Sequence, residues 1–125
     1  MSTERDVVAD FCRALADRDW DLLASTLAYD LVRVGPEGTE ADTHRGREAY
    51  LAYVQSVAGS MDRFDLQVRR IFYAADGRCA VSEYVEVIRF AGQDERVWSV
   101  VNLYRLDEST RIAELHVYGK PSPPD

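Results

Sequence analysis

The chain has 125 residues, enough for one domain with a single sizeable core, and its 46% hydrophobic and 30% charged residues are typical of a globular protein. A net charge of −7 argues against nucleic acid or an anionic membrane as the main partner. No apolar run approaches the roughly 20 residues that a membrane span needs, and no signal-peptide pattern opens the chain. We therefore expect a single domain over residues 1–120 and a disordered tail, PSPPD, over 121–125.

The cysteines and histidines predict no metal site. Cys12 and Cys79 lie within apolar patterns, which predicts two buried free thiols in a reducing cytoplasm. His44 and His116 are far apart, and neither belongs to a Cys/His/Asp cluster. We expect neither a metal nor any other cofactor.

The first half of the chain predicts three helices. Thr3 and Asp6 form a predicted capping box before the first, and Asp19 is a predicted N-cap for a short second helix. A brief strand, DLVRV, and a loop, GPEGTEADTHRG, follow. The third helix then carries apolar and aromatic residues at helical spacing: Tyr50, Tyr53, Val54 and Val57.

From residue 64 onward the apolar period changes to two, which predicts strands over 64–73, 79–90, 96–106 and 111–118. Asp76-Gly77 is a strong hairpin turn, and Arg69-Arg70 breaks the alternation as a β-bulge does. Helices that lead into a meander of long antiparallel strands predict an α+β fold, with the helices covering one face of a curved sheet.

Turn lengths predict which side chains share that covered face. If DEST is a four-residue loop, Leu106 pairs with Arg111, and Asn102 lies opposite Leu115. Leu115 is one of the apolar residues of the last strand, which lie on the face that the helices cover. Asn102, opposite Leu115, shares that face. His116 falls on the opposite face.

The same count across AGQDE pairs Phe90 with Arg96. It places Tyr84 opposite Asn102 and Glu86 opposite Val100. Three polar groups thus lie in an apolar frame made of Ile88, Trp98, Val100, Leu115 and Val117. A carboxylate, a phenol and an amide that converge among apolar walls are typical of a small-molecule site.

The chain resembles the cone-shaped nuclear-transport-factor-2-like superfamily, which includes ketosteroid isomerase, limonene epoxide hydrolase, scytalone dehydratase and the SnoaL-like polyketide cyclases. The resemblance lies in the opening VVADFCRALADRDWDLLASTLAYD, the helix HRGREAYLAYV and the hairpin YRLDESTRIAELHVYG. It implies a cone-shaped, curved antiparallel sheet with three helices over its concave face. The fold hosts many chemistries and also proteins without activity.

Compared with ketosteroid isomerase, Asn102 falls at the oxyanion-binding Asp, but Phe11 replaces the oxyanion Tyr and Gly35 replaces the general-base Asp. Steroid isomerisation by that mechanism is therefore not expected. Glu86 and Tyr84 lie at approximately the Asp and Arg positions of limonene epoxide hydrolase. Its last-strand Asp, which the cyclases also favour as an acid, is Val117 here.

We predict that Glu86 is the general base, because desolvation raises the pKa of a carboxyl group toward neutrality. Asn102 and Tyr84 are the candidate oxyanion donors. Tyr53, on the helix that covers the cone, and Phe11 complete the predicted substrate-binding wall. Alternatively, Glu86 is solvated on the convex face, and Asn102 is a buried amide satisfied by Tyr84.

These residues favour a cofactor-free isomerase, cyclase or dehydratase acting on a hydrophobic, oxygenated metabolite of polyketide or terpenoid type. The alternatives are a non-catalytic binding protein for a hydrophobic small molecule, an epoxide hydrolase, and an interaction protein with a closed cone. The fourth strand is apolar on its outer face as well, at Val97, Val101 and Leu103. Since a sheet that is apolar on both sides is covered on both sides, we expect a homodimer.

Overall fold

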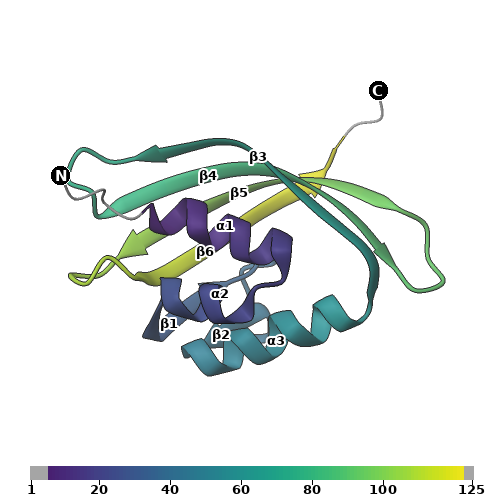
Figure 1. The fold of residues 1–125 in the computed structure, drawn as a ribbon, viewed down its shortest axis with the longest axis horizontal. Coiled ribbons are helices and arrows are strands. Elements are labelled where there is room, and N and C mark those ends of the chain that lie inside the picture. The colour runs from purple at the N-terminus through teal and green to yellow at the C-terminus, as the bar shows by residue number, and fades with distance from the viewer. Residues whose placement is uncertain (1–5, 123–125) are drawn as a thin grey trace.

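A six-stranded sheet curves over three helices in the computed structural model, which describes residues 6–122 (Figure 1). The helices are α1 (Val7–Asp17), α2 (Trp20–Thr26) and α3 (Arg47–Gly59). The strands are β1 (Leu27–Val34), β2 (Thr43–Arg45), β3 (Met61–Tyr73), β4 (Cys79–Phe90), β5 (Arg96–Leu106) and β6 (Ile112–Pro121). The predicted α+β fold, with the helices on the concave side of the sheet, is confirmed.

The strand order is β2-β1-β6-β5-β4-β3. The sheet is mixed, because β1 runs parallel to β6 while all other neighbours are antiparallel. The short strand β2 lies in a segment that the sequence predicted as loop, and it closes the edge beside β1. A register shift between Val68 and Arg70 confirms the predicted bulge in β3.

Acidic side chains begin the first two helices. The Asp19 carboxylate accepts a hydrogen bond from Leu22 N at 3.0 Å, as its predicted N-cap role requires. At α1, Asp6 itself is the N-cap and accepts from Ala9 N. The predicted capping box is therefore wrong in its cap position, and Thr3 lies outside the described residues.

The predicted pairing of β5 with β6 is wrong by two residues. Asn102 pairs with Val117 and not with Leu115, which pairs with Tyr104. One residue of the difference arises because the loop after Leu106 is one residue longer than expected, and the other arises from a bulge next to it. A shift of two preserves the face of every side chain, because the side-chain period of a strand is two.

The pairing of β4 with β5 is also wrong by two. The chain already reverses between Phe90 and Gln93, whose N–H donates to the Phe90 carbonyl at 3.0 Å. Tyr84 consequently pairs with Val100, and Glu86 pairs with Trp98. The inner face is again unchanged, so the predicted convergence of polar groups does not depend on the error.

Three further features differ from the sequence expectations or complete them. Cys12 is buried as predicted, but Cys79 is exposed because it begins β4 at the sheet rim. Pro121 belongs to β6, and Ser122 N donates to the Val97 carbonyl at 2.8 Å, so pairing extends two residues beyond residue 120. None of the helices within residues 6–122 has the length and apolarity of a membrane span.

Candidate active site

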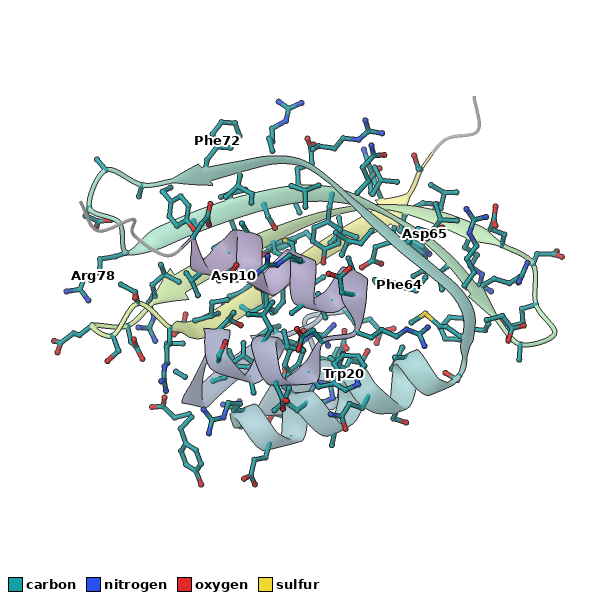
Figure 2. The ribbon with its side chains drawn as sticks, in the orientation of Figure 1. Asp10, Trp20, Phe64, Asp65, Phe72 and Arg78 are labelled. Atoms are coloured by element: carbon teal, nitrogen blue, oxygen red, sulfur yellow. The ribbon has the colours of Figure 1, made fainter. Side chains whose placement is uncertain are left out.

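A cavity of about 320 Å³ lies between the concave face of the sheet and the helices. Every side chain that the sequence placed in the site lines it: Phe11, Tyr53, Tyr84, Glu86, Ile88, Trp98, Val100, Asn102, Leu115 and Val117. Further lining comes mainly from helices and rim strands: Leu15, Arg18, Trp20, Arg33, Pro36, Tyr50, Val54, Val57, Ala58, Met61, Phe64, Phe90 and Gly119. Figure 2 shows Trp20 and Phe64 on the helix side of the sheet, whereas Phe72 points away on the opposite side.

Glu86 is the one carboxylate that lines this cavity in the described part of the chain. Its side chain forms no hydrogen bond or ion pair within residues 6–122. Burial raises the pKa of Glu86 to about 7, and the positive charge of Arg33 opposes that rise only partly. Glu86 can therefore accept and release a proton near neutral pH.

Asn102 organises a buried polar network. Its side-chain nitrogen donates to the Tyr84 hydroxyl at 3.0 Å and to the Tyr104 hydroxyl at 3.1 Å, while the Ser82 and Tyr104 hydroxyls are 2.6 Å apart. Both amide hydrogens are thus used within the protein. The alternative that Asn102 is satisfied by Tyr84 is correct for its nitrogen, whereas its Oδ1 is buried without a partner.

The Tyr84 hydroxyl is the donor that this network leaves available. It accepts from Asn102, and no acceptor for its own proton lies within hydrogen-bond distance in the described chain. Burial, reinforced by the negative charge of Glu86, raises the pKa of Tyr84 well above its usual value. Tyr84 therefore remains a neutral hydrogen-bond donor at all pH values at which Glu86 titrates.

Sequence reasoning missed three polar residues of the cavity, Arg18, Arg33 and Tyr50. Arg33 is 8% exposed, and it alternates in β1 with Leu31, which is fully buried. Residues two apart share a face of a strand, so the pair Leu31 and Arg33 carried the signal that Arg33 points inward. Tyr50 packs in the core and also lines the cavity, and burial raises the pKa of its hydroxyl.

Arg33 contacts Asp42 and Tyr53. Its Nη1 donates to Asp42 Oδ1 at 3.2 Å, and its guanidinium carbon lies 5.1 Å from the centre of the Tyr53 ring. Asp42 in turn accepts from Glu37 N at 3.0 Å. The His44 ring, which is opposite Arg33 on β2, also packs on Tyr53 at 4.1 Å between centroids, and burial together with the Arg33 charge lowers the pKa of His44.

Neither His116 nor Cys12 lines this cavity. His116 is on the outer face, opposite Leu103, as its strand parity predicted. Burial raises the pKa of the Cys12 thiol to about 11, so it stays protonated at neutral pH. Within residues 6–122 no group of three or more His, Cys, Asp or Glu side chains could hold a metal ion.

The model of the SnoaL-like domain family matches residues 8–115. No protein with a curated description matches the chain in sequence. Solved structures of the ketosteroid isomerase-like or NTF2-like fold match it along nearly its whole length, in agreement with the family resemblance of the sequence.

Three of these structures illustrate the range of relatives. An LEH-like epoxide hydrolase of M. tuberculosis is 24% identical, with a TM-score of 0.74 over 91% of this chain and 80% of that one. A candidate polyketide cyclase of Pseudomonas putida is 16% identical, with a TM-score of 0.80 over 94% and 92%. A protein of Catenulispora acidiphila in complex with trimethylamine is 18% identical, with a TM-score of 0.76 over 93% and 86%. At these identities the likeness establishes the fold and leaves the reaction open.

The raised pKa of Glu86 predicts a pH-dependent stability. Between the ordinary carboxyl pKa of 4.5 and about 7, the folded chain keeps a proton that the unfolded chain has lost. Stability from this group is therefore complete below pH 4.5, falls as the pH rises to about 7, and is then constant. Since one pKa unit corresponds to about 1.4 kcal/mol, we expect a loss of up to about 3 kcal/mol.

Urea unfolding of the wild type and of Glu86→Gln, between pH 5 and pH 8, measures this loss. Gln cannot ionise, so the difference in unfolding free energy between the two proteins isolates the Glu86 contribution. Parallel pH profiles for the two proteins would show that Glu86 is solvated.

Gly35→Ala tests whether the Asp42 carboxylate packs directly against Gly35. A Cβ at position 35 would lie 2.2 Å from Asp42 Oδ2, so the carboxylate that holds Arg33 must move. We expect a destabilisation of about 1–3 kcal/mol in thermal or urea unfolding. Gly59→Ala is the matched control, because no atom lies within 4 Å of its added Cβ. Equal stability of Gly35→Ala and the wild type would contradict the assignment.

Proposed function

The chain belongs to the SnoaL-like domain family, and from this premise we propose that it catalyses a cofactor-free proton transfer on a hydrophobic, oxygenated small molecule. The observation that carries the proposal is Glu86, a carboxyl group with a pKa of about 7 that faces an apolar cavity without a protein partner. Such a group is half ionised at neutral pH, which is the condition that general acid–base catalysis favours. Isomerases, cyclases and dehydratases of polyketide or terpenoid substrates share this need.

The proposed reaction begins at a carbon next to a substrate carbonyl. The Glu86 carboxylate takes a proton from that carbon, and the electron pair of the broken C–H bond moves to the carbonyl oxygen. The Tyr84 hydroxyl donates a hydrogen bond to this oxygen as its negative charge develops. Glu86, now a carboxylic acid, returns the proton to a second carbon in an isomerisation, or to a departing hydroxyl group in a dehydration.

Asn102 acts in this scheme as a positioning residue. Its amide hydrogens are used by the Tyr84 and Tyr104 hydroxyls, so it fixes the Tyr84 oxygen at a defined place on the inner face. Accepting a hydrogen bond from the amide also makes the Tyr84 hydroxyl a better donor, because linked hydrogen bonds polarise one another.

The cavity walls support a hydrophobic substrate. Trp98 lies directly across from Glu86 on the neighbouring strand, with Val100 and Ile88 on the same inner face. A hollow of about 320 Å³ is within the size range of small-molecule sites. A substrate that fills this hollow would displace water from the reacting groups, which strengthens their contacts and limits the conformations of a flexible substrate.

A binding protein without activity is the second candidate. The same apolar walls would hold a hydrophobic molecule without any proton transfer, and the Catenulispora acidiphila relative is in complex with trimethylamine. Epoxide opening is a third variant, favoured by the M. tuberculosis relative, and it would require a water molecule positioned by Glu86.

Proton–deuterium exchange tests the catalytic proposal without knowledge of the substrate. Enolisable apolar ketones such as 1-tetralone and 2-decalone are incubated with the protein in D2O, and loss of the α-proton signal is followed by NMR. We expect Glu86→Gln to slow protein-catalysed exchange by roughly 100-fold or more, and Tyr84→Phe by roughly 10- to 100-fold.

Glu83→Gln is the matched control, because Glu83 lies on the same strand, faces outward and pairs with Arg70. Its exchange rate should equal that of the wild type. Equal exchange in Glu86→Gln and the wild type would remove Glu86 from the mechanism. Ketone binding without exchange would favour the binding protein.

We also propose that the chain forms a homodimer through the convex face of the sheet. Large apolar side chains are exposed there on β3, β5 and β6: Phe72, Val97, Val101, Leu103 and Tyr118. Exposed apolar groups that lie together on one surface favour a second copy of the same surface, since two-fold dimers are the commonest assemblies.

Leu103→Glu tests the dimer by placing a charge among these side chains. Light scattering after size exclusion should give twice the 14.2 kDa chain mass for the wild type and the single mass for Leu103→Glu. Tyr29→Glu, at a 71% exposed residue of β1 outside the patch, should remain dimeric. A monomeric wild type would contradict the proposal.

A further inference from the structure

The Tyr50 hydroxyl is a polar group of the cavity that no protein group uses. Tyr50 lies on α3, is 4% exposed and lines the cavity. Its hydroxyl forms no hydrogen bond within residues 6–122. Three other unpaired atoms of the described chain, Arg33 Nε, His44 Nδ1 and Asn102 Oδ1, have almost no accessible surface. The Tyr50 oxygen is not among these sealed atoms, so it keeps accessible surface for a ligand.

This hydroxyl lies near Glu86 and Tyr84. Burial raises the pKa of Tyr50, the positive charge of Arg33 opposes the rise, and the negative charge of Glu86 adds to it. Burial likewise raises the pKa of Tyr84, and the charges of Glu86 and Tyr50 add to that rise. Such effects act between charged groups at short range, which places the Tyr50 hydroxyl on the cavity side of α3. No hydrogen bond joins any two of Tyr50, Tyr84 and Glu86 in the described chain, so a ligand that fills the cavity contacts all three.

Two phenol protons thus face one cavity without an acceptor. Neither the Tyr50 nor the Tyr84 hydroxyl finds an acceptor for its proton among residues 6–122. A buried hydroxyl whose proton is unpaired costs free energy. Both hydroxyls stay protonated at neutral pH, because burial raises the pKa of each. A carbonyl oxygen has two lone pairs and accepts two hydrogen bonds, so one substrate oxygen can satisfy both donors.

We propose that Tyr50 is a second hydrogen-bond donor to the substrate, whose carbonyl oxygen is bound between Tyr50 on α3 and Tyr84 on β4. The inference rests on the proposed function and names enolisable ketones as its substrate class. When Glu86 takes the α-proton, the electron pair of the C–H bond moves to the carbonyl oxygen. Both hydroxyls then bind the enolate oxygen and keep their own protons.

The carbonyl vibration of a bound ketone tests this proposal without any reaction. 1-Tetralone, deuterated at its α-carbon and labelled with carbon-13 at its carbonyl, is bound in D2O and measured by infrared difference spectroscopy. Each hydrogen bond weakens the C=O bond, so the wild type should lower the stretching frequency below its value in cyclohexane. Tyr50→Phe and Tyr84→Phe should each reverse part of this shift, and the double variant should reverse nearly all of it.

Tyr29→Phe is the matched control, because it removes the same hydroxyl group from a 71% exposed tyrosine of β1 outside the cavity. Its bound ketone should vibrate as in the wild type. An unchanged frequency in Tyr50→Phe would overturn the proposal. So would a wild type that leaves the ketone at its cyclohexane frequency, or that binds neither 1-tetralone nor 2-decalone.

Stability separates a ligand-binding hydroxyl from a structural one. Tyr50→Phe removes a buried polar group that has no protein partner, so urea unfolding should show a stability equal to or above that of the wild type. A clear loss of stability would show that the hydroxyl is satisfied within the protein and would contradict the proposal.

Comparison with proton exchange distinguishes a failure of this inference from a failure of the proposed function. Tyr50→Phe should slow ketone exchange by roughly 10-fold or more, mainly in kcat, because the hydrogen bond strengthens as charge develops on the oxygen. Glu86→Gln should lose exchange and keep the shifted carbonyl frequency. A shift that depends on both tyrosines in a wild type without exchange would remove the reaction and leave the donor pair. Exchange that depends on Glu86, with a carbonyl frequency that Tyr50→Phe leaves unchanged, would keep the reaction and remove Tyr50 from it.

Discussion

The proposed chemistry depends on the burial of one carboxyl group. Burial, and not a hydrogen bond or an ion pair, determines the proton affinity of Glu86. Trp98, its cross-strand partner, and Ile88, two residues further along β4, line the same cavity. In the proposed function the wall residues have two effects, because they bind the apolar part of the ligand and also bury Glu86, which keeps its pKa near neutrality. A change in the walls alters the acid–base group even where no atom of Glu86 is touched.

The polar network beside Glu86 has a different purpose. Ser82, Tyr84, Asn102 and Tyr104 are buried on two neighbouring strands, and their hydrogen bonds run mainly from one to another. A buried network in which partners satisfy each other fixes side-chain positions and specifies one arrangement of the core. Asn102, the amide that looks anomalous in its strand, is the centre of this network and holds the Tyr84 hydroxyl at the edge of the cavity.

Strand periodicity made much of the site predictable from the sequence. Glu86, Tyr84 and Asn102 were placed on one face by alternation, and a two-residue error in both hairpins left that placement intact. The errors themselves came from turn geometry, since one chain reversal came earlier than expected and the other was lengthened by a loop residue and a bulge. The length of such a turn depends on its local backbone conformation. Residue composition alone does not fix that conformation, so it did not determine the pairing.

Arg33 shows why the rest of the site could not be predicted in the same way. The alternation with Leu31 indicates which face of β1 Arg33 occupies. Its ion-pair partner, Asp42, comes from the segment after β1, which folds back over Gly35. Irregular segments carry no periodicity, so the partner of a buried cation cannot be inferred from spacing. The strands thus place Arg33 by alternation, and the segment between β1 and β2 supplies the carboxylate that pairs with it.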